Sequence, residues 1–152
     1  ISDPDGIEAK AQSIEGLGLL QVETRLTPLK QLRAEQAVDS RHGQPLTGYH
    51  MHLGQTWGTD CAVPFARVNG QPEGAVSANG QVMGTYLHGL FASDPFRHAF
   101  LRSMAPDIGQ GPAHEARIET VLDQLADHLE QHLDLDRLLD LAAAPLSGTP
   151  AP

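Results

Sequence analysis

Cysteine is almost absent from this sequence, since Cys61 is the single example in 152 residues. One thiol cannot form an intramolecular disulfide, and it excludes a zinc site built from several thiolates within the chain. So little cysteine is typical of proteins from a reducing compartment, and we therefore expect a cytoplasmic location.

Basic residues and long apolar runs are also scarce. Ten Lys and Arg residues stand against nineteen Asp and Glu residues, which gives a formal net charge of −9. Nucleic-acid binding needs clustered cations, so we expect no nucleic-acid partner. No apolar run approaches the roughly 20 residues that span a bilayer, so we expect no membrane partner. The first residues lack an initiator methionine and form no signal or transit peptide, and we interpret the chain as a piece of a longer protein.

The chain does contain enough apolar sequence for a folded core, with 40% hydrophobic residues. Alternation with a period of two predicts a strand within residues 16–27, which Pro28 should end or demote to an edge. Two more strands are predicted on either side of a turn at residues 39–45. The side chains that share one face of each strand are Leu32, Ala34 and Val38 in the first, and Thr47, Tyr49, Met51 and Leu53 in the second. The other face of the second strand carries Gly48, His50 and His52.

Shorter elements follow. Strands are predicted at residues 65–68, 75–77 and 82–87, because the dipeptides Asn69-Gly70 and Asn79-Gly80 between them are strong hairpin signals. Ser93-Asp94-Pro95 predicts the start of a helix that runs to about Met104, since a polar cap precedes a proline.

A Gly- and Pro-rich linker at residues 106–112 precedes the clearest helix of the sequence. Apolar residues recur there at spacings of three and four, which predicts an amphipathic helix over residues 113–143 with a bend near Leu133–Asp136. We therefore divide the chain into residues 1–112, a helical extension at 113–143 and a disordered tail at 144–152.

Histidine is abundant, with eight residues. His50 and His52 form an H-x-H pair on one strand face, but no third ligand lies nearby in sequence, so we assign no metal site. His128 and His132 flank Glu130 on the polar side of the predicted helix, and this is not the H-E-x-x-H pattern of a zinc protease. We expect no metal and no bound cofactor in this chain.

His88 is the candidate catalytic residue. It lies in the segment GTYLHGLF, in a glycine-flanked loop that follows a predicted strand. An imidazole with an ordinary pKa of about 6.5 can take up and return a proton near neutrality, although an ordinary loop histidine would have the same pattern. Cys61 lacks the tight turn or helix N-terminus that activates a thiol. We interpret Cys61 as incidental, and a Cys61–His88 dyad is the less favoured alternative.

Four segments, in this order, resemble the C-terminal part of the cobyric acid synthase family: GLGLLQVETRLT, GYHMHLGQT, GAVSANGQVMGTYLHGLFASDPFRHAFL and LADHLEQHLDLDRLLDLA. The resemblance covers about Asp3 to Ala143. It implies an α/β fold with a class I glutamine amidotransferase-like (flavodoxin-like) sheet, added antiparallel strands and a long C-terminal helix, incomplete at the N-terminus. The sheet of this family is mainly parallel.

The resemblance also implies a chemistry. A cysteine thiolate and a histidine hydrolyse glutamine, and the ammonia passes to an N-terminal ATP-binding domain. That domain, which would use ATP and Mg²⁺, amidates the corrin adenosylcobyrinic acid a,c-diamide in cobalamin biosynthesis.

Residue by residue, His88 matches the family's catalytic histidine. Leu90 stands where many class I amidotransferases have a glutamate, which agrees with the cobalamin branch. The family's nucleophile lies on a Gly-x-Cys-Gly-Gly turn that would precede residue 1, and Cys61 does not match it. We therefore expect the chain alone to be inactive. His50 replaces an acidic residue that is common in the family, so the electrostatics near the site are expected to differ.

Two groups of alternatives remain. Within the same branch they are cobyrinic acid a,c-diamide synthase and the amidotransferase subunit that acts on lipid II, both disfavoured by the C-terminal helix. An alternative of another class is a non-catalytic, His-rich fragment that binds a metal or a corrin.

If half of an amidotransferase domain is missing, the remainder should expose sheet edges and apolar surface, and the isolated chain should be marginally stable or prone to aggregate.

Overall fold

The structure is a computed structural model, and it describes residues 1–10 and 12–143, without the side chains of residues 29–31. The chain divides into two compact units, Ile1–Gly111 and Pro112–Pro152. The first unit is a mixed α/β structure built on a sheet, and the second is helical. The predicted α/β class is therefore confirmed at this level.

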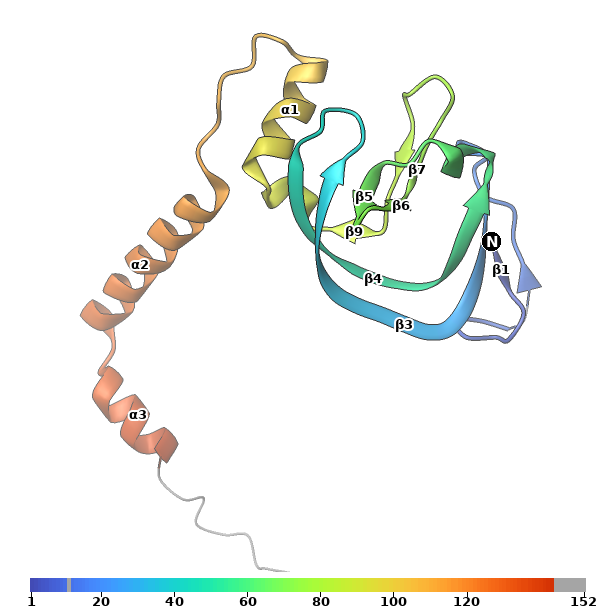
Figure 1. Cartoon of the computed structure of the whole chain (residues 1–152). Helices are drawn as coiled ribbons and strands as arrows, with labels where there is room; N and C mark the ends of the chain where they lie inside the picture. Colours follow the sequence, from blue (N-terminus) through green and yellow to red (C-terminus); the bar gives the residue numbers. More distant parts are fainter. Residues whose placement is uncertain (11, 144–152) are drawn as a thin grey trace, which may run out of the picture. The chain divides into compact units, whose positions relative to one another are not determined.

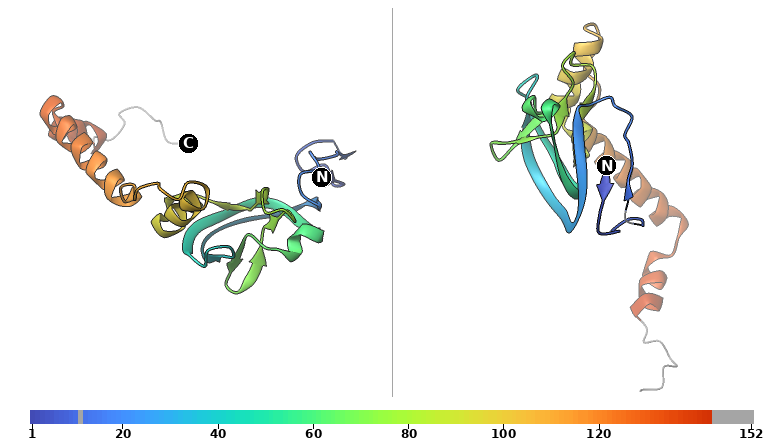
Figure 2. Two further views of the ribbon diagram at one scale, coloured as in Figure 1. Left: turned by 90° about the horizontal axis from the view of Figure 1, so that it is seen from above. Right: turned by 90° about the vertical axis from the view of Figure 1, so that its right-hand side faces the viewer.

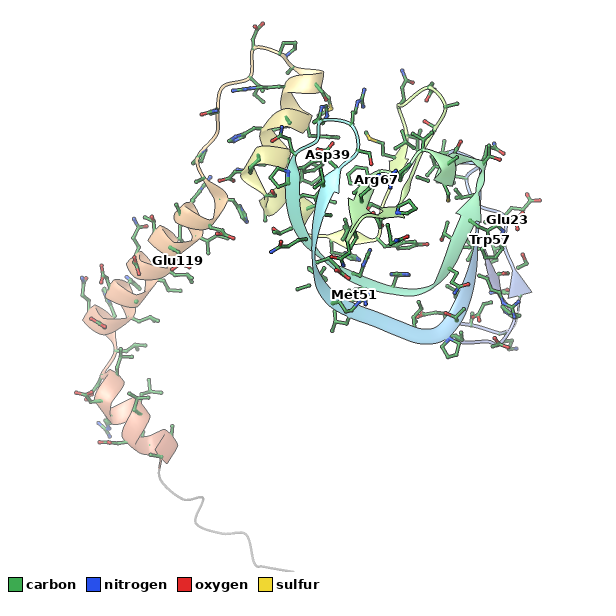
Figure 3. All side chains as sticks on the ribbon, in the orientation of Figure 1. Glu23, Asp39, Met51, Trp57, Arg67 and Glu119 are labelled. Carbon is green, nitrogen blue, oxygen red and sulfur yellow. The ribbon has the colours of Figure 1, made fainter. Side chains whose placement is uncertain are left out.

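Two long antiparallel strands, β3 (Val22–Asp39) and β4 (Pro45–Gly58), form the framework of the first unit (Figure 1). They curve together, and Figure 2 shows the curve from two further directions. The turn between them is held by Asp39, whose carboxylate accepts backbone N–H bonds from Arg41, His42 and Gln44 at 2.7–3.0 Å. Asp39 lies at this end of the hairpin in Figure 3. Both strands predicted around this turn are confirmed.

The expected strand end at Pro28 is wrong, because β3 continues through this residue. The register of β3 against β4 shifts between Arg25 and Lys30, and Pro28 lies in that irregular stretch, where a missing N–H group breaks no regular ladder. Across from it, Gly54 has φ = 122°, and a Cβ there would lie 2.5 Å from the Arg25 carbonyl oxygen. The irregularity therefore depends on a glycine in the partner strand.

The hairpin signal at Asn69-Gly70 is confirmed. These residues connect β5 (Ala66–Val68) to β6 (Gln71–Glu73), a strand that was not predicted from the sequence. The φ angles of Asn69 and Gly70 are 51° and 79°, as a two-residue turn of this kind requires. β5 also pairs with β3, so this hairpin extends the main sheet.

The second signal, Asn79-Gly80, lies between β7 (Ala75–Val76) and β8 (Met83–Gly84), which pair as a separate two-stranded sheet. The strand predicted at residues 82–87 is wrong as a single element, because its end belongs to β9 (Leu87–His88), which pairs with β4 in the main sheet. The chain changes sheets between Gly84 and Leu87, and alternation in sequence cannot show such a change.

Short strands also occur in the first 16 residues, which were expected to be a loop. β1 (Ser2–Asp3) pairs antiparallel with β2 (Gln12–Ser13) and parallel with β3, so the central order is β2-β1-β3-β4-β9. Within the described residues this β1–β3 contact is the one parallel pair of strands. The mainly parallel sheet that the resemblance implies is therefore not formed by this part of the chain.

Helix α1 (Asp94–Met104) begins and ends where the sequence predicts. Ser93 precedes it as expected, but its hydroxyl donates to the carbonyl oxygen of Pro45 at 2.9 Å and not to the end of the helix. Phe96 of α1 is almost completely buried. It packs in a core that also contains Ala37, Leu46, Phe65, Ala66, Val68, Leu87 and Leu90.

The second unit contains α2 (His114–His132) and α3 (Leu135–Ala143) in place of one continuous helix. The break lies within the predicted bend near Leu133–Asp136. No residue of α2 or of α3 is buried, so the apolar side of both helices is exposed. None of the helices in the described part of the chain combines the length and apolar character needed to cross a membrane. The predicted disordered tail, 144–152, lies outside the described residues.

Candidate functional site

The two faces of the β3–β4 hairpin have different chemistry. The inner face carries Ala37, Leu46 and His50, which are buried. The outer face carries Leu32, Tyr49 and Met51, which are 65%, 42% and 42% exposed. Met51 lies at the bend of the hairpin in Figure 3. The histidine side of β4 therefore faces the interior, whereas its apolar side faces solvent.

His88 lies at the end of strand β9, and the loop position expected from the sequence is wrong. In the antiparallel pairing of β4 and β9, Tyr49 is the cross-strand neighbour of His88, and His50 is the neighbour of Leu87. Alternation then places the His88 side chain on the outer face and Leu87 on the inner face. The Tyr49 and His88 rings are stacked, with centroids 5.2 Å apart and planes 16° from parallel.

The backbone around His88 is held on both sides. Leu87 and Leu90 are buried in the core, so they fix the chain just before and just after the histidine. Gly89 has φ = 75°, a conformation that favours glycine and turns the chain out of the strand. On β4, a Cβ at Gly48 would lie 2.6 Å from the His88 carbonyl oxygen. The close approach of β9 to β4 therefore requires a glycine at position 48.

A buried cluster of charged and titratable groups lies on the inner face. His50 is placed between two buried carboxylates: its Nδ1 atom is 3.6 Å from Glu35 Oε1, and its Nε2 atom is 3.7 Å from Glu73 Oε1. Glu73 also accepts hydrogen bonds from the Thr85 hydroxyl at 2.7 Å and from the Tyr86 backbone N–H at 2.8 Å. His50, which the resemblance places at the position of an acidic residue, thus lies between two acidic side chains.

His52 lies beside this cluster and stacks on Tyr86, with ring centroids 4.3 Å apart. Burial and, secondarily, the charge of His50 hold the pKa of His52 below its ordinary value, so its neutral form is favoured. His50, His52, Glu73 and Tyr86 line a cavity of about 750 Å³. The β4 side of the cavity therefore carries two imidazole rings, and the neutral form is favoured for that of His52.

Cys61 lines the same cavity, in the short 3₁₀ turn Thr59–Ala62. Burial, together with the nearby Asp60 carboxylate, raises the pKa of its thiol. A nucleophilic cysteine needs the opposite change, because the thiolate is the reactive form. Cys61 belongs to the inner side of the sheet and His88 to the outer side, so the structure does not bring this pair together.

The remaining histidine pair is in the second unit. His128 and His132 stack on one turn of α2 with centroids 4.2 Å apart, and the His132 Nδ1 atom lies 2.8 Å from the His128 carbonyl oxygen. The two histidine pairs therefore belong to different units. Among residues 1–10 and 12–143, no group of three or more His, Cys, Asp or Glu side chains is arranged to hold a metal ion.

His88, His50 and His52 stand out in the sequence, but no role could be predicted there for Tyr49, Glu35 or Glu73. Glu35 and Glu73 reach His50 from β3 and β6, and Tyr49 reaches His88 from β4. These relationships depend on the pairing of strands, for which the local sequence carries no signal. The alternation in β4 could have indicated that Tyr49 and His50 point to opposite faces.

Residues 1–96 match the family model of the CobB/CobQ-like glutamine amidotransferase domain. Three curated relatives are cobyric acid synthases: 51% identical in Bradyrhizobium diazoefficiens, 53% in Cereibacter sphaeroides and 51% in Brucella canis. Each comparison covers 142 residues, which are 93% of this chain and 29% of the relative. The chain thus spans less than a third of the length of these relatives. The match must also extend beyond residue 96 into the helices, because it is longer than the family model.

Proposed function

Because the chain belongs to the CobB/CobQ-like glutamine amidotransferase domain family, we propose that it forms the histidine-bearing part of a glutamine-hydrolysing domain, with His88 as the general base. The observation that supports this role is the placement of His88. Its backbone is anchored by Leu87 and Leu90 in the core, while its imidazole is presented on the exposed outer face. A catalytic base needs this combination of a fixed backbone and an accessible ring.

The chemistry proposed for this ring is proton transfer. An amide carbonyl is a weak electrophile, so a thiolate is needed to attack the glutamine side chain. His88 would take the proton from the thiol and return it to the departing ammonia, and backbone N–H groups would stabilise the oxyanion of the intermediate. Water would then release glutamate from the thioester. We assign the thiol to a Gly-x-Cys-Gly-Gly turn in a segment outside this chain, because the pKa of Cys61 is raised and Cys61 lies on the inner side.

The wider reaction is proposed from the relatives. They are named cobyric acid synthases, so we propose that the ammonia serves the ATP-dependent amidation of adenosylcobyrinic acid a,c-diamide in cobalamin biosynthesis. ATP and Mg²⁺ would bind to an N-terminal synthetase domain and not to this chain. The relatives with this name match 93% of the chain at 51–53% identity, and this supports the assignment over cobyrinic acid a,c-diamide synthase.

The test uses the intact protein that contains this chain. His88→Ala should abolish glutamine-dependent amidation, but amidation with added ammonium should continue, because ammonia then no longer has to come from glutamine. His128→Ala, an exposed histidine of α2, is the matched control and should retain both activities. Retention of glutamine-dependent activity by His88→Ala would refute the assigned role.

A second test concerns the chain alone. Purified residues 1–152 should release no glutamate from glutamine, since the nucleophile that we propose is not among them. If glutamate is released and the activity disappears in Cys61→Ala, then Cys61 is the nucleophile and our assignment is wrong.

A non-catalytic metal or corrin binder is the alternative of another class. Two observations weigh against it: His50 presents its two ring nitrogens to different carboxylates, and the other histidine pair lies in the second unit. Calorimetric titration with zinc and with a corrin should therefore show no stoichiometric binding. Micromolar binding that is lost in His50→Ala and in His52→Ala would favour the binder.

A further inference from the structure

A general base works well only when its ring is held in a productive orientation. In cysteine and serine enzymes a third group, usually a carboxylate or an amide, orients the histidine. Position 90, two residues after His88, is a leucine buried in the core and cannot take that role. In the part of the chain that the structure describes, no hydrogen bond or ion pair reaches the His88 ring.

Tyr49 is the group that does contact the ring. It lies directly across from His88 in the β4–β9 ladder, and the two rings stack with planes only 16° apart. Such a stack restricts rotation of the imidazole about its bond to Cβ, because tilting the ring would separate the two faces. It leaves the edge of the imidazole, which carries both nitrogens, free to approach a reaction partner.

Small residues give Tyr49 the room to make this contact. Ala34 is its cross-strand partner on β3, so no large side chain competes for the outer face at that position. Gly89 follows β9, and a Cβ there would meet the Tyr49 ring at 3.6 Å, an ordinary van der Waals distance, so the ring also reaches this residue. Gly48 precedes Tyr49 and permits the close approach of β9. The ring of Tyr49 therefore lies against His88 and the residue that follows it.

We propose that Tyr49 is the positioning residue for His88, and that its ring supplies by stacking the orientation that a carboxylate supplies in other histidine-dependent enzymes. The inference rests on the proposed role of His88 as the base. Tyr49 does not touch the substrate in this account. It holds the plane of the imidazole so that one ring nitrogen faces the thiol. The same nitrogen can then deliver the proton to the departing ammonia.

The first test observes the ring itself and requires no activity. In protein labelled with ¹³C at the histidine rings, the His88 signals, assigned with His88→Gln, should carry an upfield ring-current shift from Tyr49. Tyr49→Leu and Tyr49→Thr should remove this shift, whereas Tyr49→Phe should preserve it. Two non-aromatic variants are used so that one poorly folded protein does not decide the result. Tyr86→Leu is the matched control, because Tyr86 stacks on His52 and should move only the His52 signals.

The second test is kinetic and uses the intact protein. Tyr49→Leu should lower kcat for glutamine hydrolysis by about ten- to a hundredfold, as expected for a misoriented base, with KM for glutamine changed less than about twofold. Tyr49→Phe, which keeps the stacked ring, should retain the kcat of the wild type. Unchanged kcat in Tyr49→Leu, or a lowered kcat with unchanged His88 signals, would overturn the inference. If the signals move as expected but His88→Ala still hydrolyses glutamine, the positioning contact stands and the proposed function fails.

Discussion

Gly48 approaches His88 so closely that a single added carbon would collide with it: a Cβ at Gly48 would lie 2.6 Å from the His88 carbonyl oxygen. This contact joins β4 to β9, the two strands that bring Tyr49 beside His88. Because Gly48 has no side chain, β9 can lie close against β4. This close contact and the core packing of Leu87 and Leu90 together fix the backbone that carries His88.

We predict that Gly48→Ala lowers the free energy of unfolding by about 1–3 kcal/mol, since the backbone of β9 must move to admit the methyl group. Urea unfolding measures the change. Gly16→Ala is the control, because nothing lies within 4 Å of a Cβ at Gly16. Equal stability of the two variants would show that β9 does not pack on β4 as described.

Stability should depend on the protonation of His52. Its pKa is held below the ordinary value of 6.5, chiefly by burial. Between the folded pKa and 6.5 the unfolded chain binds more protons, so the free energy of unfolding is highest above pH 6.5 and falls as the pH decreases through the folded pKa. His52→Phe keeps a ring against Tyr86 and removes the titration, so it should flatten this part of the profile of urea midpoint against pH.

The control for this experiment is His128→Phe, in the second unit, which should leave the slope of the profile unchanged. A slope that is the same in wild type and in His52→Phe would mean that another group controls stability in this range.

Cys61 should behave as an unreactive thiol. Burial and the Asp60 carboxylate raise its pKa, so less thiolate is present at neutral pH. Alkylation by iodoacetamide should be several-fold slower in the folded chain than in the urea-unfolded chain, as followed by mass spectrometry. In the intact protein, Cys61→Ala should keep glutamine hydrolysis within about twofold of wild type. Rapid alkylation of the folded chain would contradict this description.

The outer face should cause the isolated chain to associate. Leu32 and Met51 are cross-strand partners on this face and are both exposed. Exposed apolar surface on a sheet favours association, so Leu32→Lys with Met51→Lys should shift the chain toward the monomer. Light scattering after size-exclusion chromatography measures this. Gln36→Lys adds charge on the same face without removing apolar surface and is the control. A wild-type chain that is a monodisperse monomer with a sharp two-state transition would refute the prediction.

Local signals in the sequence predicted a large part of the fold. Asn69-Gly70 and Asn79-Gly80 each mark a hairpin, because their backbone preferences suit tight turns regardless of what surrounds them. The start of α1 and the break after α2 were predicted for the same kind of reason, since a proline in the first turn and apolar spacing act over a few residues, although Ser93 makes no capping bond. The strand end predicted at Pro28 is wrong for the opposite reason. The pairing of β3 with β4, which local sequence does not show, includes an irregularity that accommodates this proline.

The candidate site was predicted only in part. The segment around His88 indicated both a candidate catalytic histidine and a family, since both signals come from consecutive residues. The partners of His50 and His88 could not be predicted, because Glu35, Glu73 and Tyr49 arrive from other strands. Whether two such side chains meet depends on strand register, and a shift of one residue would move each of them to the opposite face.

By itself, therefore, the sequence determined the membership of a family, the local turns and helices, and the choice of His88 as a candidate base. It also determined that β4 has one apolar and one histidine-bearing face. Only the tertiary structure decided that the histidine face is buried and the apolar face exposed, and that His88 lies beside Tyr49 and on the side away from Cys61. The physical reason is that alternation fixes which side chains share a face, while the contacts between distant segments fix which face is covered.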